Sequence, residues 1–300
     1  MSDSGWISAH LFHHGDQDRM LTGLVDPLAG ELRERGWADR FFFLRYWNGG
    51  PHIRLRVRPC DDTVRDDLRR LIEHRAAAYF QRFPAPDRLT RAEYLASART
   101  IGAWEGVAPI EHMYANNSVH FLPYDREHHR YGSGATIETV EDHFTESSAL
   151  ALAQLRSRTG QQRRETAVLC CLLLAWTLGS EDVPGLARRQ LVKAGSRGSA
   201  REALYEARRD HVLALAADMR ESARGERRTA GGGTLRRWTA SLAKVVDALN
   251  ADATAPSAES AADLCAHLFA NRVGVRVDAE GALRYLAARA VTDPDGSQGE

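Results

Sequence analysis

The sequence predicts an α+β fold, with a mixed or antiparallel sheet in the N-terminal half and a helical C-terminal half. Two observations lead to this prediction. Short aromatic runs separated by turn signals occupy the chain before residue 135, which is typical of strands. From Ile137 onward, the apolar residues recur with the spacing of helices. A chain of 300 residues is long enough to bury one large core or two small ones.

The N-terminal half is expected to follow the order β-α-β-β-α-β. Dense aromatic or alternating runs predict the strands, amphipathic stretches predict the helices, and Asn48-Gly49-Gly50-Pro51 is a strong signal for a tight turn. The expected strands are 6–12, 40–47, 52–58 and 117–124, and the expected helices are 18–35 and 62–83. The segment 87–116 is less regular and leaves room for a further element. This order suggests a sheet with helices on one face.

The strand HIRLRVR, residues 52–58, alternates apolar and basic residues with a period of two. Its apolar side chains therefore lie on one face of the sheet and its basic side chains on the other. Arginines on such a face bind carboxylate or phosphate groups through bidentate hydrogen bonds. Charges on an exposed sheet edge also serve solubility, and the strand pattern leaves both interpretations open.

The C-terminal half is predicted to be helical. The expected helices are 138–158, 163–179, 199–222, 234–250, 257–271 and 279–291, with a loop at Gly225–Gly233. The apolar run Ala167–Leu178 contains Cys170 and Cys171 and is predicted to be core. It is too short to cross a bilayer, which needs about 20 residues.

Composition narrows the function classes. The net charge is zero, and a nucleic-acid-binding protein needs a basic surplus, so direct binding of tRNA is not expected. The cysteines Cys60, Cys170, Cys171 and Cys265 lack metal-ligand spacing. Dinucleotide, Walker, GxSxG and HExxH motifs are missing, so we expect no cofactor and no metal. The sequence begins without a signal peptide, which predicts a cytoplasmic protein that does not enter a membrane.

Two further segments carry chemistry-bearing residues. The first is YDREHHRYGSG, residues 124–134, which combines titratable side chains with a glycine turn before a helix. It is either a charged surface loop or a weak anion site. The second is CAHLFANRV, residues 265–273, in which His267 and Asn271 share one helix face. A single helical histidine is more often structural than catalytic, and Asn116-Asn117-Ser118 is predicted to be a simple turn.

Taken in order, these motifs resemble the C-terminal family of lantibiotic dehydratases, also known from thiopeptide-type bacteriocin biosynthesis. FFFLRYWNGGPHIRLRV is similar to the family's "FFIRY…GGPHLRLR", and YDREHHRYGSG is similar to "YxPExxRYGG". DHFTESS resembles "FxxDS", and HLFANRVG resembles "HMxxNRLxG". Ser133, Leu268 and Phe269 depart from the family pattern. The resemblance runs from Trp6 to about Val291.

The resemblance implies one stand-alone domain over residues 1–300, with a β-rich half at 1–135 and a helical half at 136–300. In full-length dehydratases, a larger N-terminal region transfers glutamate from glutamyl-tRNA to Ser or Thr of a precursor peptide. The C-terminal domain then eliminates glutamate and leaves dehydroalanine or dehydrobutyrine. Because this chain starts at the C-terminal domain, it resembles a split elimination enzyme.

Two other functions remain open. Stand-alone members also resemble the thiopeptide pyridine synthase, which joins two dehydroalanines by a formal aza-[4+2] cycloaddition. A noncatalytic protein that docks a precursor peptide to another enzyme is the third possibility. Elimination is favoured because an arginine cluster suits an anionic leaving group, whereas dehydroalanines are neutral. A pure docking protein has no reason to keep the arginine and histidine set.

The resemblance also assigns roles. The elimination residues correspond to His267, Arg54, Arg56 and Arg130, which we expect to meet in one pocket, with His267 transferring the proton. The substrate-binding residues are expected to be Arg45, His52, Tyr131, Asn271 and Arg272. The implied partners are the leader and core of a precursor peptide, a separate glutamylating subunit and a second copy of the chain.

Overall fold

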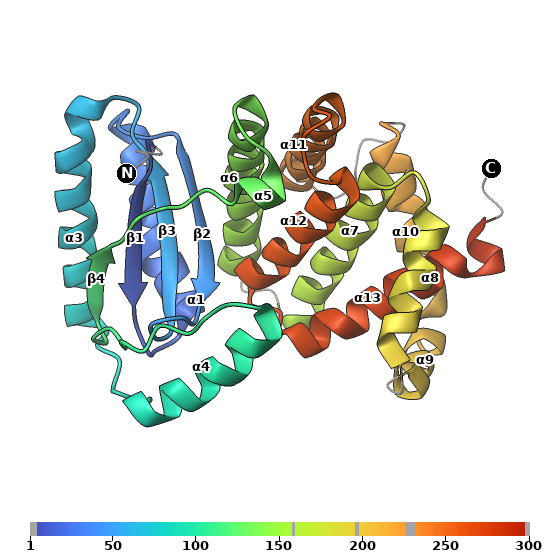
Figure 1. Ribbon diagram of the computed structural model, residues 1–300, viewed down its shortest axis with the longest axis horizontal. Helices are drawn as coiled ribbons and strands as arrows, with labels where there is room; N and C mark the ends of the chain where they lie inside the picture. Colours follow the sequence, from blue (N-terminus) through green and yellow to red (C-terminus); the bar gives the residue numbers. More distant parts are fainter. Residues whose placement is uncertain (1–4, 158–159, 196–197, 226–231, 298–300) are drawn as a thin grey trace. The chain divides into compact units, whose positions relative to one another are not determined.

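The computed structural model describes residues 5–157, 160–195, 198–225 and 232–297. It divides into two compact units, Met1–Arg126 and Glu127–Glu300 (Figure 1). The first unit holds the sheet, and the second unit is built from helices. The predicted α+β class is therefore confirmed. Residues 226–231 of the predicted loop lie outside the described residues.

The sheet of the first unit has four antiparallel strands in the order β2-β3-β1-β4. The strands are β1 (Ile7–Phe12), β2 (Arg40–Tyr46), β3 (His52–Arg58) and β4 (Ser118–Phe121). Each strand lies within a range that was predicted to be a strand from the sequence. The sheet is wholly antiparallel, which settles the choice between a mixed and an antiparallel arrangement.

The turn between β2 and β3 requires its two glycines. Gly49 and Gly50 have φ angles of 93° and 113°, a region that residues with a Cβ avoid. The amide of Gly49 also donates to the hydroxyl of Tyr94, 2.7 Å away. This turn fixes the register of the hairpin, in which Tyr46 faces His52.

The register confirms the predicted two-faced character of β3. Ile53, Leu55 and Val57 pair with Leu11, Ala9 and Ile7 of β1, and all six are buried. Helix α3 (Arg65–Arg82) packs against β1 and β4 (Figure 1). Its buried side chains recur every three or four positions, at Leu68, Ile72, Ala76, Tyr79 and Phe80, so one stripe of the helix closes this core.

The remaining helices of the first unit connect the strands. The stretch after β1 consists of α1 (Gln17–Met20), the π-helical turn η1 (Leu21–Val25) and α2 (Asp26–Glu34), and a short turn η2 (Asp62–Val64) precedes α3. The irregular segment after α3 contains α4 (Arg91–Glu105). Thr90 and Glu93 form a reciprocal capping box at the start of α4. Helix α4 is the further element for which the sequence leaves room in this segment.

The second unit is a bundle of helices. They are α5 (His128–Tyr131), α6 (Ala135–Arg156), α7 (Gln161–Gly179), α8 (Val183–Ala194), α9 (Gly198–Glu206), α10 (Arg209–Ala223), α11 (Gly232–Ala251), α12 (Ala258–Val273), α13 (Val277–Thr292) and the short turn η4 (Pro294–Ser297). Helix α12 begins at an N-cap serine, Ser257, and ends at Gly274 with a φ of 74°. Both are the residue types that these positions prefer.

Helix α7 forms the centre of this bundle. It packs against α10, α12 and α13, while α6 packs against α11 and α12 (Figure 1). Every residue from Val168 to Trp176 is buried, which confirms that the apolar run is core. Cys170, Cys171 and Cys265 are buried as well, whereas Cys60 of the first unit is exposed. Among the described residues, no helix has both the length and the apolar character needed to cross a bilayer.

The second unit differs from the prediction in three places, the first of which is the short helix α5, which was not predicted. Helix α8 was not predicted, although Asp182 caps its first turn by accepting from the amide of Gly185. The predicted helix 199–222 is divided at residues 207–208 into α9 and α10. No glycine or proline marks this break, so the sequence pattern predicts one continuous helix across it.

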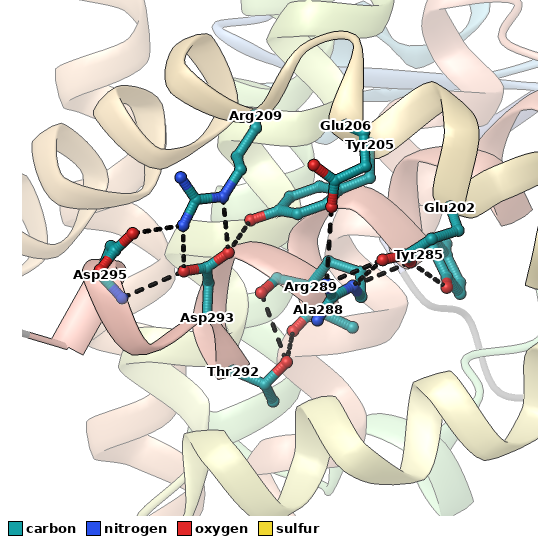
Figure 2. Close-up of polar contacts among 10 residues, drawn as sticks. All are labelled: Glu202, Tyr205, Glu206, Arg209, Tyr285, Ala288, Arg289, Thr292, Asp293 and Asp295. Carbon is teal, nitrogen blue, oxygen red and sulfur yellow. Dashed lines mark hydrogen bonds and ion pairs between the residues drawn. The ribbon is translucent and has the colours of Figure 1, made fainter.

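A polar network joins α9 and α10 to α13 and η4 (Figure 2). Arg209 makes two parallel hydrogen bonds to Asp293, of 2.7 and 3.0 Å, and a further one to Asp295. The buried hydroxyl of Tyr205 donates to Asp293 at 2.8 Å. On the neighbouring turn, Glu202 binds Arg289 and accepts from Tyr285. The hydrogen bond from Arg209 lowers the pKa of Asp293 to about 2.

Replacing Asp293 by alanine is expected to destabilise the second unit. The change removes the only carboxylate that the Tyr205 hydroxyl contacts in Figure 2, and a buried hydroxyl without a partner is costly. We expect the Tm to fall by about 5 °C or more, as measured by circular dichroism. Asp295, which is 65% exposed, supplies the matched control, since Asp295→Ala should shift the Tm by no more than about 2 °C. Equal shifts would contradict this account.

Candidate functional site

The polar face of the sheet gathers histidine and arginine side chains from two neighbouring strands. His10 of β1 lies opposite Arg54 of β3, and Ser8 lies opposite Arg56. On the same face, His52 lies opposite Phe12. His10, His52 and Arg56 are buried, and Arg54 is half-buried. Strand alternation thus assembles a basic patch on the face that α3 does not cover.

The two histidines form a directed hydrogen-bond chain. His52 Nδ1 lies 2.8 Å from the carbonyl oxygen of Gly50, and His52 Nε2 lies 3.1 Å from His10 Nδ1. Burial lowers the pKa of His52 to about 3 and that of His10 to about 2, so both rings are neutral. Because a carbonyl only accepts, His52 carries its proton on Nδ1. His10 must then donate from Nδ1 to His52, which leaves a lone pair on His10 Nε2.

Arg54 and Arg56 lie against aromatic rings. The guanidinium carbon of Arg54 is 3.3 Å from the centroid of the Tyr46 ring, and that of Arg56 is 5.2 Å from the Tyr124 ring. Stacking of this kind holds a guanidinium in place. The aromatic residues that stack on these two arginines therefore come from the aromatic segments at 40–47 and 117–124.

Arg45, predicted to bind substrate, lies on the opposite face of the sheet. Its strand position pairs with Ile53, on the apolar side, and its guanidinium forms an ion pair of 2.5 Å with Asp18 of α1. This ion pair ties β2 to the helical segment after β1. The substrate-binding role of Arg45 stays a prediction. Its ion pair with Asp18 is a structural contact.

His267 of α12 forms a hydrogen-bonded dyad with Glu280 of α13. His267 Nδ1 lies 2.8 Å from Glu280 Oε2, with the imidazole 38% exposed and the carboxylate buried. Because the carboxylate accepts, the proton of the neutral ring sits on Nδ1. In this neutral tautomer Nε2 carries a lone pair, and the ring that contains it is partly exposed. A carboxylate that orients an imidazole in this way is the arrangement of a general base.

Glu280 is itself fixed by a chain of ionic contacts. Its other oxygen accepts from Arg284 at 2.9 Å, and Arg284 also binds Asp263, which accepts from the indole of Trp176 at 2.8 Å. The chain ends in the α7 core, where Trp176 is buried. The orientation of His267 is therefore set by packed elements rather than by a loop.

Three sequence motifs far apart in the chain meet around Phe144 of α6. Tyr131 packs on the Phe144 ring edge to face, with centroids 5.3 Å apart, and the guanidinium carbon of Arg272 lies 5.3 Å from the same ring. Arg272 also donates to Ser147 at 3.2 Å. Burial lowers the pKa of Arg272 to about 10 and raises the pKa of Tyr131. The structure gives these two residues packing contacts in the core of the second unit.

The other predicted residues are placed on two helices of the second unit. Arg130 lies on α5, where it is half-exposed and 3.3 Å from Glu127, and Asn271 is half-buried on α12. Arg54 and Arg56 belong to the first unit. The meeting of Arg54, Arg56, Arg130 and His267 in one pocket stays a prediction. Within the described parts of the chain, no group of three or more His, Cys, Asp or Glu residues has metal-binding geometry.

Two polar residues of these clusters were not predicted. His10 sits in an aromatic strand, and its position beside Arg54 follows only from the register of β1 with β3. Glu280 lies in the first turn of α13, where an acidic residue is ordinary because it favours the helix N-terminus. Strand alternation could have placed His10 on a face with Ser8 and Phe12, but no sequence signal pairs Glu280 with His267.

Comparisons with known proteins agree on the fold. The family described as "Lantibiotic biosynthesis dehydratase C-term" matches residues 6–291. The structure resembles the pyridine synthase TbtD from thiomuracin biosynthesis, with a TM-score of 0.77 and 20% identity over 97% of this chain and 99% of that one. It also resembles TsrL, with a TM-score of 0.59 and 17% identity over 95% and 93% of the two chains.

A third solved structure covers a larger protein. The tRNA-dependent lantibiotic dehydratase MibB from Microbispora sp. 107891 matches with a TM-score of 0.58 and 21% identity, over 98% of this chain and 28% of that chain. The comparison with curated protein sequences gives no significant match. At these identities, the structural likenesses establish a shared fold.

Proposed function

This chain belongs to the family of lantibiotic biosynthesis dehydratase C-terminal domains, and from that membership we propose that it eliminates glutamate from glutamylated Ser or Thr of a precursor peptide. The observation that carries the proposal is the dyad of His267 and Glu280. Elimination needs a base for the α-proton, and a histidine held by a buried carboxylate is suited to that task. The basic patch with Arg54 and Arg56 is suited to the anion that leaves.

The bond changes follow from the ester. His267 Nε2 takes the proton from Cα, the electron pair forms the Cα=Cβ double bond, and the bond from Cβ to the ester oxygen breaks. Glutamate departs as a carboxylate, and Arg54, Arg56 and Arg130 would bind its charge. Activation is already present in the ester, so acid–base chemistry and anion binding are sufficient.

A second function is supported by the comparisons. The likeness to the pyridine synthase TbtD spans nearly the whole of both chains at a TM-score of 0.77, against 0.58 for the dehydratase MibB. We therefore retain the formal aza-[4+2] cycloaddition of two dehydroalanines as the alternative. In that reaction the dyad would move a proton during ring closure, and the basic patch would bind the peptide.

Further proposals complete this function. We propose that the partner is the leader and core of a precursor peptide, that a separate glutamylating subunit supplies the ester, and that the chain acts as one domain in the cytoplasm. Dimer formation is a further proposal.

One assay separates the two reactions. The purified protein is incubated with a synthetic peptide that carries glutamyl esters on serine, and separately with a peptide that carries two dehydroalanines. Elimination predicts release of free glutamate and one discrete mass decrease per ester, detected by mass spectrometry. Persistence of the ester, together with cyclisation of the dehydroalanine peptide to a pyridine, would establish the alternative instead.

The basic patch supplies a matched variant for this assay. Arg56→Lys keeps the positive charge but cannot make two parallel hydrogen bonds to a carboxylate, so we expect glutamate release to slow by about 10-fold or more. Arg70 lies on the exposed side of α3 and pairs with Asp67. Arg70→Lys should leave the rate unchanged. Equal rates for the wild type and Arg56→Lys would contradict anion binding at Arg56.

A further inference from the structure

The hydrogen-bond chain on the polar face of the sheet ends in an acceptor atom that the proposed reaction does not use. His10 Nε2 is buried and has no hydrogen-bond partner among the residues that the structure describes. A buried polar atom without a partner is energetically unfavourable, so its presence indicates a ligand or a bound water.

The direction of the chain fixes what His10 Nε2 can bind. Gly50 can only accept, so His52 donates to Gly50 and His10 donates to His52. Both imidazoles are held further by stacking, with the rings of His10 and His52 4.9 Å apart and Phe12 4.4 Å from His52. Because His10 already donates its single ring proton, Nε2 can only accept. A ligand at this atom must therefore bring an N–H or O–H group.

The surroundings of this acceptor are basic. Arg54 lies directly opposite His10 on the neighbouring strand, and Arg56 lies one alternate position along. Residues opposite one another in such a pair have Cβ atoms about 5 Å apart. The acceptor and a guanidinium are therefore close enough for one small ligand to contact both. A short molecule that carries both a hydrogen-bond donor and an anionic group would match this patch.

We propose that His10 is a substrate-binding residue that accepts a hydrogen bond from the amino group of the glutamyl moiety, while the arginines beside it hold the carboxylate. This inference rests on the proposed glutamate elimination. A glutamyl group joined through its α-carboxyl, as in glutamyl-tRNA, keeps a free amino group and a free side-chain carboxylate. Those two groups match the acceptor and the arginines, whereas a plain dicarboxylate lacks the donor.

The test compares two ligands that differ only in that amino group. Short alanine peptides with a central diaminopropionate carry either a glutamyl or a glutaryl group in amide linkage, which removes the labile ester. Calorimetric titration of the full chain to millimolar peptide should give about tenfold tighter binding of the glutamyl peptide, the size of one hydrogen bond. Equal affinities of the two peptides for the wild type would overturn the inference.

Variants of His10 separate recognition from folding. His10→Phe keeps a ring to stack on His52 but removes the acceptor, so the tenfold preference should fall to about one. His10→Gln retains an acceptor and should keep part of the preference. The control is His120→Gln on β4, because His120 Nε2 already contacts Ser118 at 3.1 Å, and it should retain the full preference. Loss of the preference in the control as strongly as in His10→Phe would count against a specific role for His10.

The same titration distinguishes failure of this inference from failure of the proposed function. Binding of both peptides with equal affinity leaves glutamate elimination in place and removes only the role of His10. Binding of neither peptide, together with binding of a matched peptide that contains two dehydroalanines, overturns elimination and the role of His10 with it.

Discussion

His267→Ala is expected to slow glutamate release by a factor of about 10²–10⁴, which is the usual contribution of a positioned general base. The side chain is partly exposed, and its Nδ1 contacts the buried Glu280 at 2.8 Å. Alanine is well tolerated in a helix, so the variant should fold. Stopped reactions analysed by mass spectrometry, at saturating and at limiting peptide, give kcat and kcat/KM separately.

The partner of His267 provides a graded variant. Glu280→Gln keeps a hydrogen-bond acceptor for Nδ1 but removes the charge that stabilises the protonated imidazole. We expect kcat to fall by about 10-fold or more, less than for His267→Ala, with KM little changed. His74 lies exposed on α3 of the first unit, and His74→Ala should leave both constants unchanged. A rate for His267→Ala close to that of the wild type would remove His267 from the reaction.

Acid should destabilise this protein well above the pH at which its carboxylates are protonated. Burial lowers the pKa of His10 to about 2 and the pKa values of His52 and His143 to about 3, whereas an unfolded histidine titrates near about 6.5. Below that pH these histidines are protonated in the unfolded chain but stay neutral in the folded chain. The contribution of these histidines to the free energy of unfolding is therefore constant above about pH 6.5 and is lost as the pH drops toward 3.

The expected loss is large. Each of these histidines contributes a slope of about 1.4 kcal/mol per pH unit, or about 2 kcal/mol by pH 5, so the three together remove roughly 6 kcal/mol. That is comparable to the whole stability of many domains. Urea titrations at a series of pH values measure the slope. His10→Phe removes one titrating group and should flatten it, while an unchanged free energy of unfolding at pH 5 would contradict the buried neutral rings.

Local sequence patterns predicted most of the fold. The period of two in HIRLRVR placed Ile53, Leu55 and Val57 on the buried face, and Gly49 and Gly50 marked the hairpin turn that the structure contains. Elements without such signals were missed. Helix α8 begins at a single capping aspartate, and the break between α9 and α10 falls in a continuous helix-favouring stretch.

The candidate site depended on long-range contacts that no local pattern contains. The motif resemblance pointed to His267, but its pairing with Glu280 depends on how α12 and α13 lie. It also pointed to Tyr131 and Arg272, and their shared contact with Phe144 in the second unit likewise depends on how the helices pack. Their role in substrate binding stays a prediction.

The buried thiols of the second unit can be used to detect local unfolding of its helices. Burial raises the pKa of Cys170 and of Cys265 to about 12, and Cys171 lies fully buried beside Cys170. Alkylating reagents attack the thiolate, so these sites react only during excursions in which α7 or α12 leaves the bundle. Cys60, exposed after β3, reacts at once and calibrates the reagent. Cys60 gives the first adduct, and the buried thiols give the later ones. The rate at which mass spectrometry detects these later adducts then measures the rate of local unfolding of the second unit under native conditions.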